Sequence, residues 1–450
     1  MTERGPLAAE VERRLGNRRL LWVGLRGDDI ESLADLLQFS GVFSIFGSYK
    51  GRQGIQSASY EELTGVRVDP EVWDIDEHPR DSATLEFRQR ILGTLGAGSI
   101  LLPYRPSQFL SSLYFVRNRE CLYLGQFHAQ QAAFEHKPWV ETAVSQLGLP
   151  QVPWSYIAEE EQDRAAGLVS LGPVVLRQSR TSGGRGFAHV DSPDGLAAAW
   201  RMGDESFVSV SQLIKGGIPV NVGATVWRDG ITVHHPSIQL IGIKSCVTRE
   251  FGYCGNDFGL ARELDVEIID KIETATMRIG QWLRTYGYLG GFGVDFLIHE
   301  GVPLFMEVNP RFQGSTPASC RLSIEAGEAC LLLEHVAAWL GIPCPSGRPL
   351  RSKVSETPDL SNLVVHWTGL DTKPVDAIRL VDSLRVVDSS IRADVIAPTA
   401  VRSQPGSTVA RLTLRRRVTT TGLILDGDLD EVVAAWQMEE SAGRISGSAR

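Results

Sequence analysis

Side chains suited to hold a metal ion are concentrated in residues 293–311, where two apolar segments flank a short turn. A hairpin centred near Gly301 would place Asp295 opposite Glu307, and residues opposed in a sheet point to the same face. Asn309 lies two residues beyond Glu307 and therefore shares that face. Mg²⁺ prefers carboxylate and other oxygen ligands together with water and substrate phosphates. We predict a magnesium site at Asp295, Glu307 and Asn309; the alternative is a hairpin with two solvated acids.

Two basic residues have positions that suit an anionic ligand. Arg311 follows a proline that fixes the turn, and its planar fork of donors could hold a phosphate or a carboxylate beside the same face. Lys137 opens a helix expected over residues 138–147. A lone lysine at a helix start is usually exposed to solvent, so its role depends on its neighbours.

A glycine-rich segment over residues 174–190 has the pattern of strand, loop and strand. Glycines allow backbone N–H groups to approach phosphate oxygens closely, and Arg177 at the end of the first strand adds a permanent positive charge. No Gly-Lys-Ser/Thr follows, so the segment is not a Walker P-loop. We predict a loop that covers phosphates, against the alternative of an ordinary hairpin turn, and its residues are Ser182, Gly183, Gly184, Arg185 and Gly186.

A strand that starts at Phe207 leads into Gln212, Leu213 and Ile214 and then into a Gly-Gly turn. The backbone groups of such a linker could bind the edge of an adenine. A plain β-turn is equally compatible with these residues, so both interpretations stay open.

The chain divides into four predicted domains, at residues 1–125, 126–205, 206–345 and 346–450. Residues 19–38 have the strand, turn and helix with which a Rossmann-like half-unit begins, but GxGxxG is absent, so NAD and FAD are not expected. Residues 207–243 predict antiparallel strands, and helices are expected over 265–286 and 324–340. After a linker at 343–349, short strands and a helix predict a separate small α/β domain. The fold class is a multidomain combination of α/β and α+β.

Composition disfavours several classes of function. The 450 residues carry 45 Lys+Arg and 54 Asp+Glu, and a net charge of −9 disfavours nucleic acid as a partner. No apolar segment reaches the roughly 18 residues of a membrane span, and no signal peptide is evident, so we expect a cytoplasmic protein without a membrane partner. The six cysteines contain no CxxC pair, so neither a disulfide framework nor a thiolate zinc site is expected.

The motifs, in this order, resemble the ATP-grasp superfamily: a Rossmann-like pre-domain, a lysine at a helix start, a strand with a basic residue, a glycine loop, a hinge strand and Asp…Glu-x-Asn-Pro-Arg. The resemblance covers about residues 1–345 and is most specific in its final segment. Residues 134–140, 180–184 and 253–258, with the extra C-terminal domain, look most like the bacterial peptide ligases of the pheganomycin type. The resemblance implies an ATP-grasp fold with a Rossmann-like pre-ATP-grasp domain and an extra small C-terminal α/β domain.

The resemblance also implies a carboxylate–amine ligase, in which ATP phosphorylates a carboxylate and an amine attacks the acyl phosphate to give an amide, ADP and phosphate. The implied cofactors are ATP and two magnesium ions. The implied substrates are a small carboxylate and an amino acid or peptide amine in secondary metabolism, and a homodimer is compatible with it. It assigns ATP phosphates to Lys137, Arg177 and the loop 182–186, adenine to Gln212, Leu213 and Ile214, magnesium to Asp295, Glu307 and Asn309, and the catalytic role to Arg311 with Glu307 and Asn309.

Two departures limit the resemblance. Arg177 stands where many members have lysine, which keeps the charge, and the hinge lacks the usual acidic residues, so no ribose contact is assigned. Within the same fold, carboxylation or phosphorylation of a small molecule is the alternative reaction. A catalytically silent nucleotide sensor is the alternative class, and the complete set of metal ligands argues against it.

Two further basic segments leave their roles open. Lys244, Arg249 and residues 253–257 lie in a glycine-rich segment that is either a substrate-binding loop or a charged surface loop. Arg411 and residues 415–417 make a C-terminal strand basic. For that strand a solvated face is favoured over substrate recognition.

Overall fold

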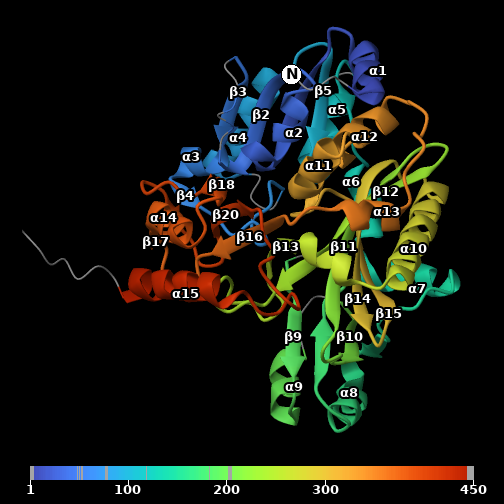
Figure 1. Cartoon of the computed structure of the whole chain (residues 1–450), viewed down its shortest axis with the longest axis vertical. Helices are drawn as coiled ribbons and strands as arrows, with labels where there is room; N and C mark the ends of the chain where they lie inside the picture. The colour runs from blue at the N-terminus through green and yellow to red at the C-terminus, as the bar shows by residue number, and fades with distance from the viewer. Residues whose placement is uncertain are drawn as a thin grey trace, which may run out of the picture.

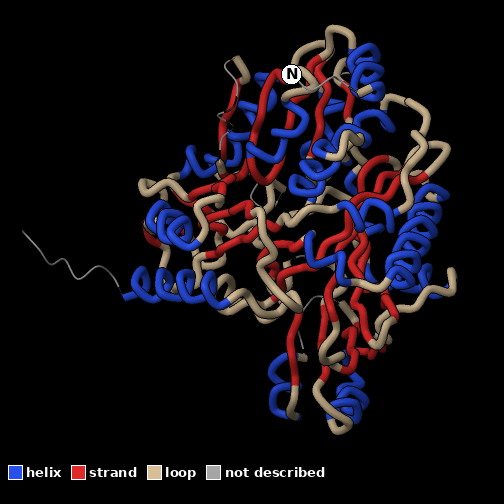
Figure 2. Tube along the Cα trace, viewed as in Figure 1, coloured by secondary structure: helices blue, strands red, loops and turns tan. Residues whose placement is uncertain are grey.

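The computed structural model describes residues 5–442 except 48, 50, 52–53, 77–79, 118, 182 and 201–204. Figure 1 shows a parallel sheet at the top, a large sheet in the middle and a small lobe at the bottom. In Figure 2 the helices flank the strands of all three, as in layered α/β architectures. No described helix is both long and apolar enough to cross a membrane.

The N-terminal residues form a parallel sheet in the order β3-β2-β1-β5-β6, which agrees with the Rossmann-like prediction. Both faces are covered, so β1 is nearly continuous apolar sequence. The strands are β1 (Arg19–Arg26), β2 (Phe39–Phe46), β3 (Gln56–Ser59), β5 (Ser99–Pro103) and β6 (Leu122–Tyr123). The helices are α1 (Pro6–Leu15), the 3-10 turn η1 (Gly27–Ile30), α2 (Glu31–Ala34), α3 (Tyr60–Thr64), α4 (Ser82–Thr94), α5 (Gln108–Val116) and α6 (His128–Phe134).

The small lobe is an antiparallel sheet in the order β7-β10-β8-β9, backed by two helices. Strand β10 pairs with β7 and β8, so the chain leaves this lobe after residue 212 and not at residue 205, where we expected the boundary. Pairing with strands earlier in the chain cannot be read from its local pattern. The elements are β7 (Ser155–Ala158), η2 (Glu159–Glu161), α8 (Gln162–Val169), β8 (Val174–Arg177), β9 (Phe187–Val190), α9 (Pro193–Ala199) and β10 (Phe207–Gln212).

The large sheet has the order β15-β14-β11-β12-β13-β16-β20-β18. Its last three strands come from the C-terminal hundred residues, which bury a core of their own but continue the same sheet. The predicted domain boundary near residue 345 therefore does not coincide with an edge of the large sheet, which continues into the C-terminal residues. The strands are β11 (Ile218–Val226), β12 (Ile231–Ile241), β13 (Tyr253–Asp257), β14 (Gly290–His299), β15 (Val302–Asn309), β16 (Ser361–His366), β18 (Arg392–Ile396) and β20 (Thr408–Leu414).

Helices cover both faces of the large sheet. On one face α7 (Lys137–Gln146), α10 (Val266–Thr285) and α13 (Leu350–Glu356) share a core with its strands. On the other, α12 (Leu331–Trp339) packs between this sheet and the parallel sheet. The helix expected over 324–340 is in fact the end of α11 (Thr316–Glu325) followed by α12, because Gly327 adopts φ +71° and ends the first helix.

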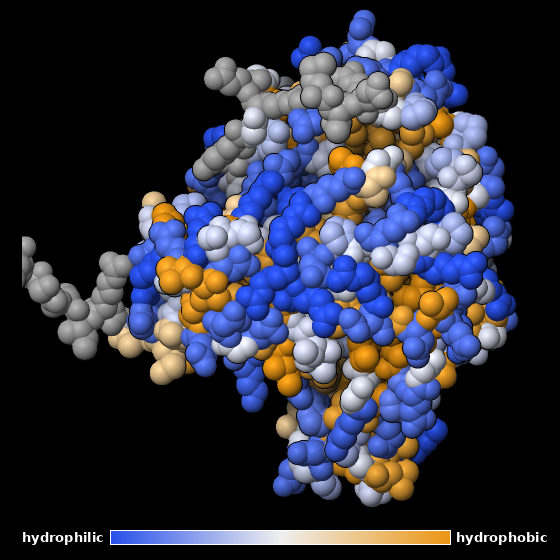
Figure 3. Space-filling model, in the orientation of Figure 1, coloured by the Kyte–Doolittle hydropathy of each residue, from blue (hydrophilic) through white to orange (hydrophobic). Residues whose placement is uncertain are grey.

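The C-terminal residues are tied to the N-terminal ones by a short sheet in the order β17-β19-β4. Hydrophilic side chains dominate the face of the molecule in Figure 3, and its apolar side chains form separate small patches. The remaining elements are β4 (Val66–Arg67), η3 (Gly259–Glu263), β17 (Lys373–Pro374), α14 (Ala377–Val387), β19 (Arg402–Ser403) and α15 (Gly427–Ala442).

Candidate active site

The β14–β15 hairpin makes Asp295 and Glu307 cross-strand partners, as the sequence predicted. The turn consists of two residues at positive φ, Glu300 and Gly301, so a regular ladder would set Asp295 opposite Met306. A bulge beside Asp295 inserts one extra residue and restores the pairing with Glu307. The predicted pairing is confirmed, and it depends on a bulge that the hairpin pattern does not indicate.

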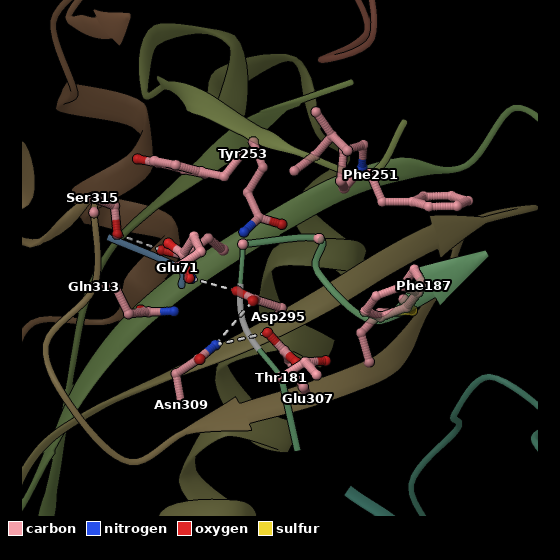
Figure 4. Close-up of a pocket in the computed structure, with 18 of the residues that line it drawn as sticks. Glu71, Thr181, Phe187, Phe251, Tyr253, Asp295, Glu307, Asn309, Gln313 and Ser315 are labelled. Atoms are coloured by element: carbon pink, nitrogen blue, oxygen red, sulfur yellow. Dashed lines mark hydrogen bonds between the residues drawn. The ribbon is translucent and has the colours of Figure 1, made fainter. Parts of the chain in front are cut away.

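The Asn309 amide donates to both carboxylates and so links them (Figure 4). Asn309 Nδ2 donates to Asp295 Oδ2 at 3.0 Å and to Glu307 Oε1 at 3.2 Å. Asn221, the partner of Asp295 on β11, donates to its other oxygen at 2.5 Å and accepts a hydrogen bond from Ser315. Asn221 was not identified from the sequence, although a polar residue inside an apolar strand is a visible signal.

Burial and neighbouring charges shift the pKa values of the two carboxylates in opposite directions. Burial, with repulsion from Glu307, raises the pKa of Asp295. Burial would also raise the pKa of Glu307, but Lys137 outweighs it and holds this pKa below its usual range. The Lys137 ammonium lies 3.0 Å from Glu307 Oε2 and donates to the Thr181 carbonyl at 2.8 Å. The lysine at the helix start is therefore buried against the predicted metal ligands and is not solvent-exposed.

Arg177 ends β8 inside the protein, with a side chain that is 1% exposed. Its guanidinium lies 2.7 Å from Glu141 Oε1 and stacks at 3.8 Å over the ring of Trp154. Glu141 also accepts the hydroxyl of Tyr156, and Arg177 Nε has no hydrogen-bond partner among the described residues. The structure thus places a paired, stacked guanidinium in the wall of the site; neither partner was identified from the sequence.

The glycine loop between β8 and β9 is closed over the site. Gly183, Gly184 and Gly186 all have positive φ, which favours glycine at each. A Cβ at Gly183 would overlap the side chain of Glu71, and one at Gly184 would overlap the Phe251 carbonyl. The loop therefore contacts both the N-terminal part and the segment before β13. Arg185 donates to the backbone of Glu71 at 3.0 Å, and Ser182 lies outside the described residues.

Some hydrogen-bond donors of the linker after β10 are already paired with backbone carbonyls of the small lobe. The Gln212 side chain donates to Leu168, and the Leu213 N–H donates to the Pro173 carbonyl, each within 3 Å. Gln212, Leu213 and Ile214 all line the cavity described next. The linker thus presents a wall to the site, while the Leu213 N–H is turned to the small lobe.

Arg311 reaches the site from the segment after β15. Its Nε lies 3.6 Å from Glu135, which also pairs with Arg105 at 3.0 Å. Burial would raise the pKa of Glu135, but the two arginines hold it below its usual range. Two guanidiniums against one carboxylate leave positive charge for a ligand at this end of the site.

One cavity of about 590 Å³ unites most of the predicted residues. Arg185 and Gly186 of the loop are not among its lining residues. Sequence reasoning also missed Gln313, which lines the cavity and occupies the space that a side chain at Gly293 would take. The predicted residues that line it are Lys137, Arg177, Gly183, Gly184, Gln212, Leu213, Ile214, Asp295, Glu307, Asn309 and Arg311.

The donor set fits a hard divalent cation whose remaining ligands come from elsewhere. No group of three His, Cys, Asp or Glu side chains suited to a metal occurs in the described part of the chain. Two carboxylates and one amide are present, which matches Mg²⁺ completed by phosphate oxygens and water. Asn309 now donates through nitrogen, so it would turn its amide to offer oxygen.

Comparison with known proteins agrees with this geometry. The family described as ATP-grasp domain matches residues 144–315. The formate-dependent phosphoribosylglycinamide formyltransferase of Synechococcus sp. (strain WH7803) is 25% identical over 217 residues, 46% of this chain and 51% of that protein. The enzyme of the same name from Syntrophotalea carbinolica is 26% identical over 308 residues, 67% and 68% of the two chains. The chain thus spans about half the length of the first of these relatives.

Solved structures match over most of the chain. N5-carboxyaminoimidazole synthase from Aspergillus clavatus, in complex with ADP and 5-aminoimidazole ribonucleotide, has a TM-score of 0.60 at 14% identity, covering 93% of this chain and 99% of that chain. Biotin carboxylase from Campylobacter jejuni has a TM-score of 0.59 at 13% identity, covering 94% and 95%. The family match and the shared fold support the resemblance to the ATP-grasp superfamily. None of these names describes a peptide ligase, so they do not support the likeness to the pheganomycin type. The chain has the ATP-grasp fold, and its residues 144–315 match the ATP-grasp domain family.

Proposed function

We propose that the protein is an ATP-dependent ligase that activates a carboxylate as an acyl phosphate and joins it to an amine. The observation that carries the proposal is the convergence on one cavity of paired carboxylates, basic side chains and a closed glycine loop. Phosphoryl transfer is catalysed mainly by positioning and by electrostatic stabilisation, and this cavity contains the groups for both.

Asp295, Glu307 and the amide oxygen of Asn309 would hold Mg²⁺. The raised pKa of Asp295 supports this assignment, because a buried carboxylate beside another gains from a divalent cation. Bound there, magnesium would neutralise charge on the ATP phosphates. Lys137, which now neutralises Glu307, would then be available to a phosphate oxygen.

The other residues have roles that follow from their positions. Arg177 would hold the phosphates from the β8 side, and the backbone N–H groups of Gly183 and Gly184 would cover them. Gln212 to Ile214 would frame the adenine. Arg311 would stabilise charge on the transferring phosphoryl group and on the acyl phosphate. A closed loop would also exclude water, which otherwise hydrolyses an acyl phosphate.

Two kinds of amine are candidates for the acceptor. An amino acid or peptide amine gives a peptide ligase, as the motifs suggest. The second candidate is formylation or carboxylation of a ribonucleotide amine, which the names of the relatives and of the solved structures favour. Both use the same ATP site with a different carboxylate and amine.

The test is incubation with ATP, Mg²⁺ and a panel of amino acids, peptides, formate, bicarbonate and ribonucleotide amines. We expect ADP and phosphate, a new C–N bond by mass spectrometry, and transfer of one ¹⁸O atom from a labelled carboxylate to the phosphate released. AMP with pyrophosphate, or phosphate without label, would show that the acyl-phosphate mechanism is wrong.

A further inference from the structure

The cavity extends past the proposed ATP site to the carboxyl ends of β1, β2 and β5. In open parallel sheets, ligands bind at this edge where the strand order reverses, and here it reverses at β1, between β2 and β5. Apolar side chains form much of the lining at this end. They are Val23, Ile45, Trp73, Ile75, Phe87 and Leu110.

This apolar recess differs from the rest of the site, whose lining carries many charged and polar side chains. Ile45 and Trp73 are half-buried at the edge of the core that α4 and α5 form with the sheet. Both line the cavity, so part of their surface faces the cavity and not packed side chains. An apolar group bound there gains about 25 cal/mol per Å² removed from water. Ribose hydroxyls placed there would lose hydrogen bonds without replacement.

One position at the same edge that could bind a phosphate already holds an acid of this chain. The first N–H groups of α5, at Gln108 and Phe109, donate to the Asp76 carboxylate at 2.5 and 3.0 Å. Helix N-termini are where proteins bind phosphate, and a phosphomonoester of charge near −2 would meet the Asp76 carboxylate there instead.

Surplus positive charge is buried beside the recess. Arg26 and Arg411 share one oxygen of Asp29, at 3.0 and 2.9 Å, so two guanidiniums face one carboxylate. Arg26 lines the cavity, and its Nη2 has no hydrogen-bond partner in the part of the chain that the structure describes. Arg411, for which the sequence favoured a solvated face, is in fact buried. An anion in the cavity would compensate this charge.

Charged groups of both signs line the cavity. Burial raises the pKa of Tyr104, while Arg311 and Arg26 both oppose the rise, so the two guanidiniums act on one region. Asp74 also lines the cavity and supplies a carboxylate acceptor. A ligand there would meet cationic, anionic and apolar surface within one recess.

We propose that this recess is the subsite for an amino acid with an apolar side chain. Its carboxylate lies toward Arg311 and the Arg26 charge, its ammonium toward Asp74, and its side chain in the apolar recess. The inference rests on the proposed function, because this carboxylate is the one that ATP would activate. It selects an amino acid over a ribonucleotide as the substrate of the N-terminal part.

Calorimetric binding tests the subsite without requiring turnover. The full-length protein with Mg²⁺ and a non-hydrolysable ATP analogue is titrated with L-leucine, L-phenylalanine, L-alanine, L-aspartate and 5-aminoimidazole ribonucleotide. We expect affinity to rise about fourfold per buried methylene, from about 0.8 kcal/mol each, so leucine binds at least tenfold more tightly than alanine. Aspartate and the ribonucleotide should bind more weakly than leucine.

Ile45→Phe fills the recess and should weaken leucine at least tenfold while leaving the affinity for the ATP analogue unchanged. Val72→Ala, at an exposed position of the neighbouring loop, is the matched control and should change neither. Selective leucine binding, together with no ADP and no new C–N bond in the incubation with ATP and the substrate panel, would support the subsite and refute the ligase. Equal affinity for leucine and alanine, tighter binding of the ribonucleotide, or no binding by any amino acid would overturn the subsite, even if ATP-dependent ligation of another substrate is found.

Discussion

Glu141→Gln tests whether Arg177 is held in place for phosphate. Glu141 and Arg177 are 3% and 1% exposed, and their side chains form a two-oxygen contact at 2.7 and 2.9 Å. Removing one partner of a buried ion pair costs about 3–5 kcal/mol, because the other charge stays buried and unpaired. Glutamine keeps one acceptor oxygen, so we expect a loss near the lower end, about 3 kcal/mol.

Nucleotide should recover part of this loss. If Arg177 contacts phosphates, ATP replaces the missing negative charge, so an ATP analogue with Mg²⁺ should raise the melting temperature of Glu141→Gln more than that of the unmodified protein. Thermal and urea unfolding with and without the analogue measure both effects, and exposed Glu160→Gln is the control. A loss below 1 kcal/mol would refute the energetic reasoning. An equal nucleotide shift in both proteins would refute the phosphate role of Arg177.

Glu307→Ala should reduce turnover at least a hundredfold, since it removes a carboxylate at the metal site; normal activity at ordinary Mg²⁺ would contradict the metal assignment. Gly184→Ala should raise the KM for ATP more than tenfold, because its Cβ would overlap the Phe251 carbonyl, whereas Gly148→Ala, at a similar positive φ in open space, should leave KM unchanged. His335 is buried with its pKa lowered to about 4, so the unfolded chain binds more protons between pH 4 and about 6.5. Its contribution to stability is complete above pH 6.5 and is lost as the pH falls, by about 2 kcal/mol between pH 7 and 5; urea unfolding should show a flatter pH dependence in His335→Gln, and an identical slope would contradict this account.

Local patterns in the sequence predicted much of the site. Asp295, Glu307 and Asn309 lie in one hairpin, and the glycine loop lies between two consecutive strands, so contacts close in the chain decide their geometry. The pattern of a helix start also indicated the position of Lys137. These motifs, with their order, were sufficient to recognise the ATP-grasp fold.

Tertiary structure decided the partners of these residues. The bulge that sets Asp295 opposite Glu307, the burial of Lys137 against Glu307 and the pairing of Arg177 with Glu141 depend on packing. The C-terminal strands join the large sheet, a pairing over more than a hundred residues that no local period encodes.

The N-terminal recess shows the same division. No sequence signal distinguished its apolar residues, because periodicity indicates that a side chain is buried but not whether it faces packed core or a cavity. Arg411 read as solvated because its ion-pair partner, Asp29, lies 382 residues away in the chain. The sequence by itself determined which chemistry the residues can support, and the tertiary structure determined which of them meet, because charge pairing and cavity shape arise from contacts between distant segments.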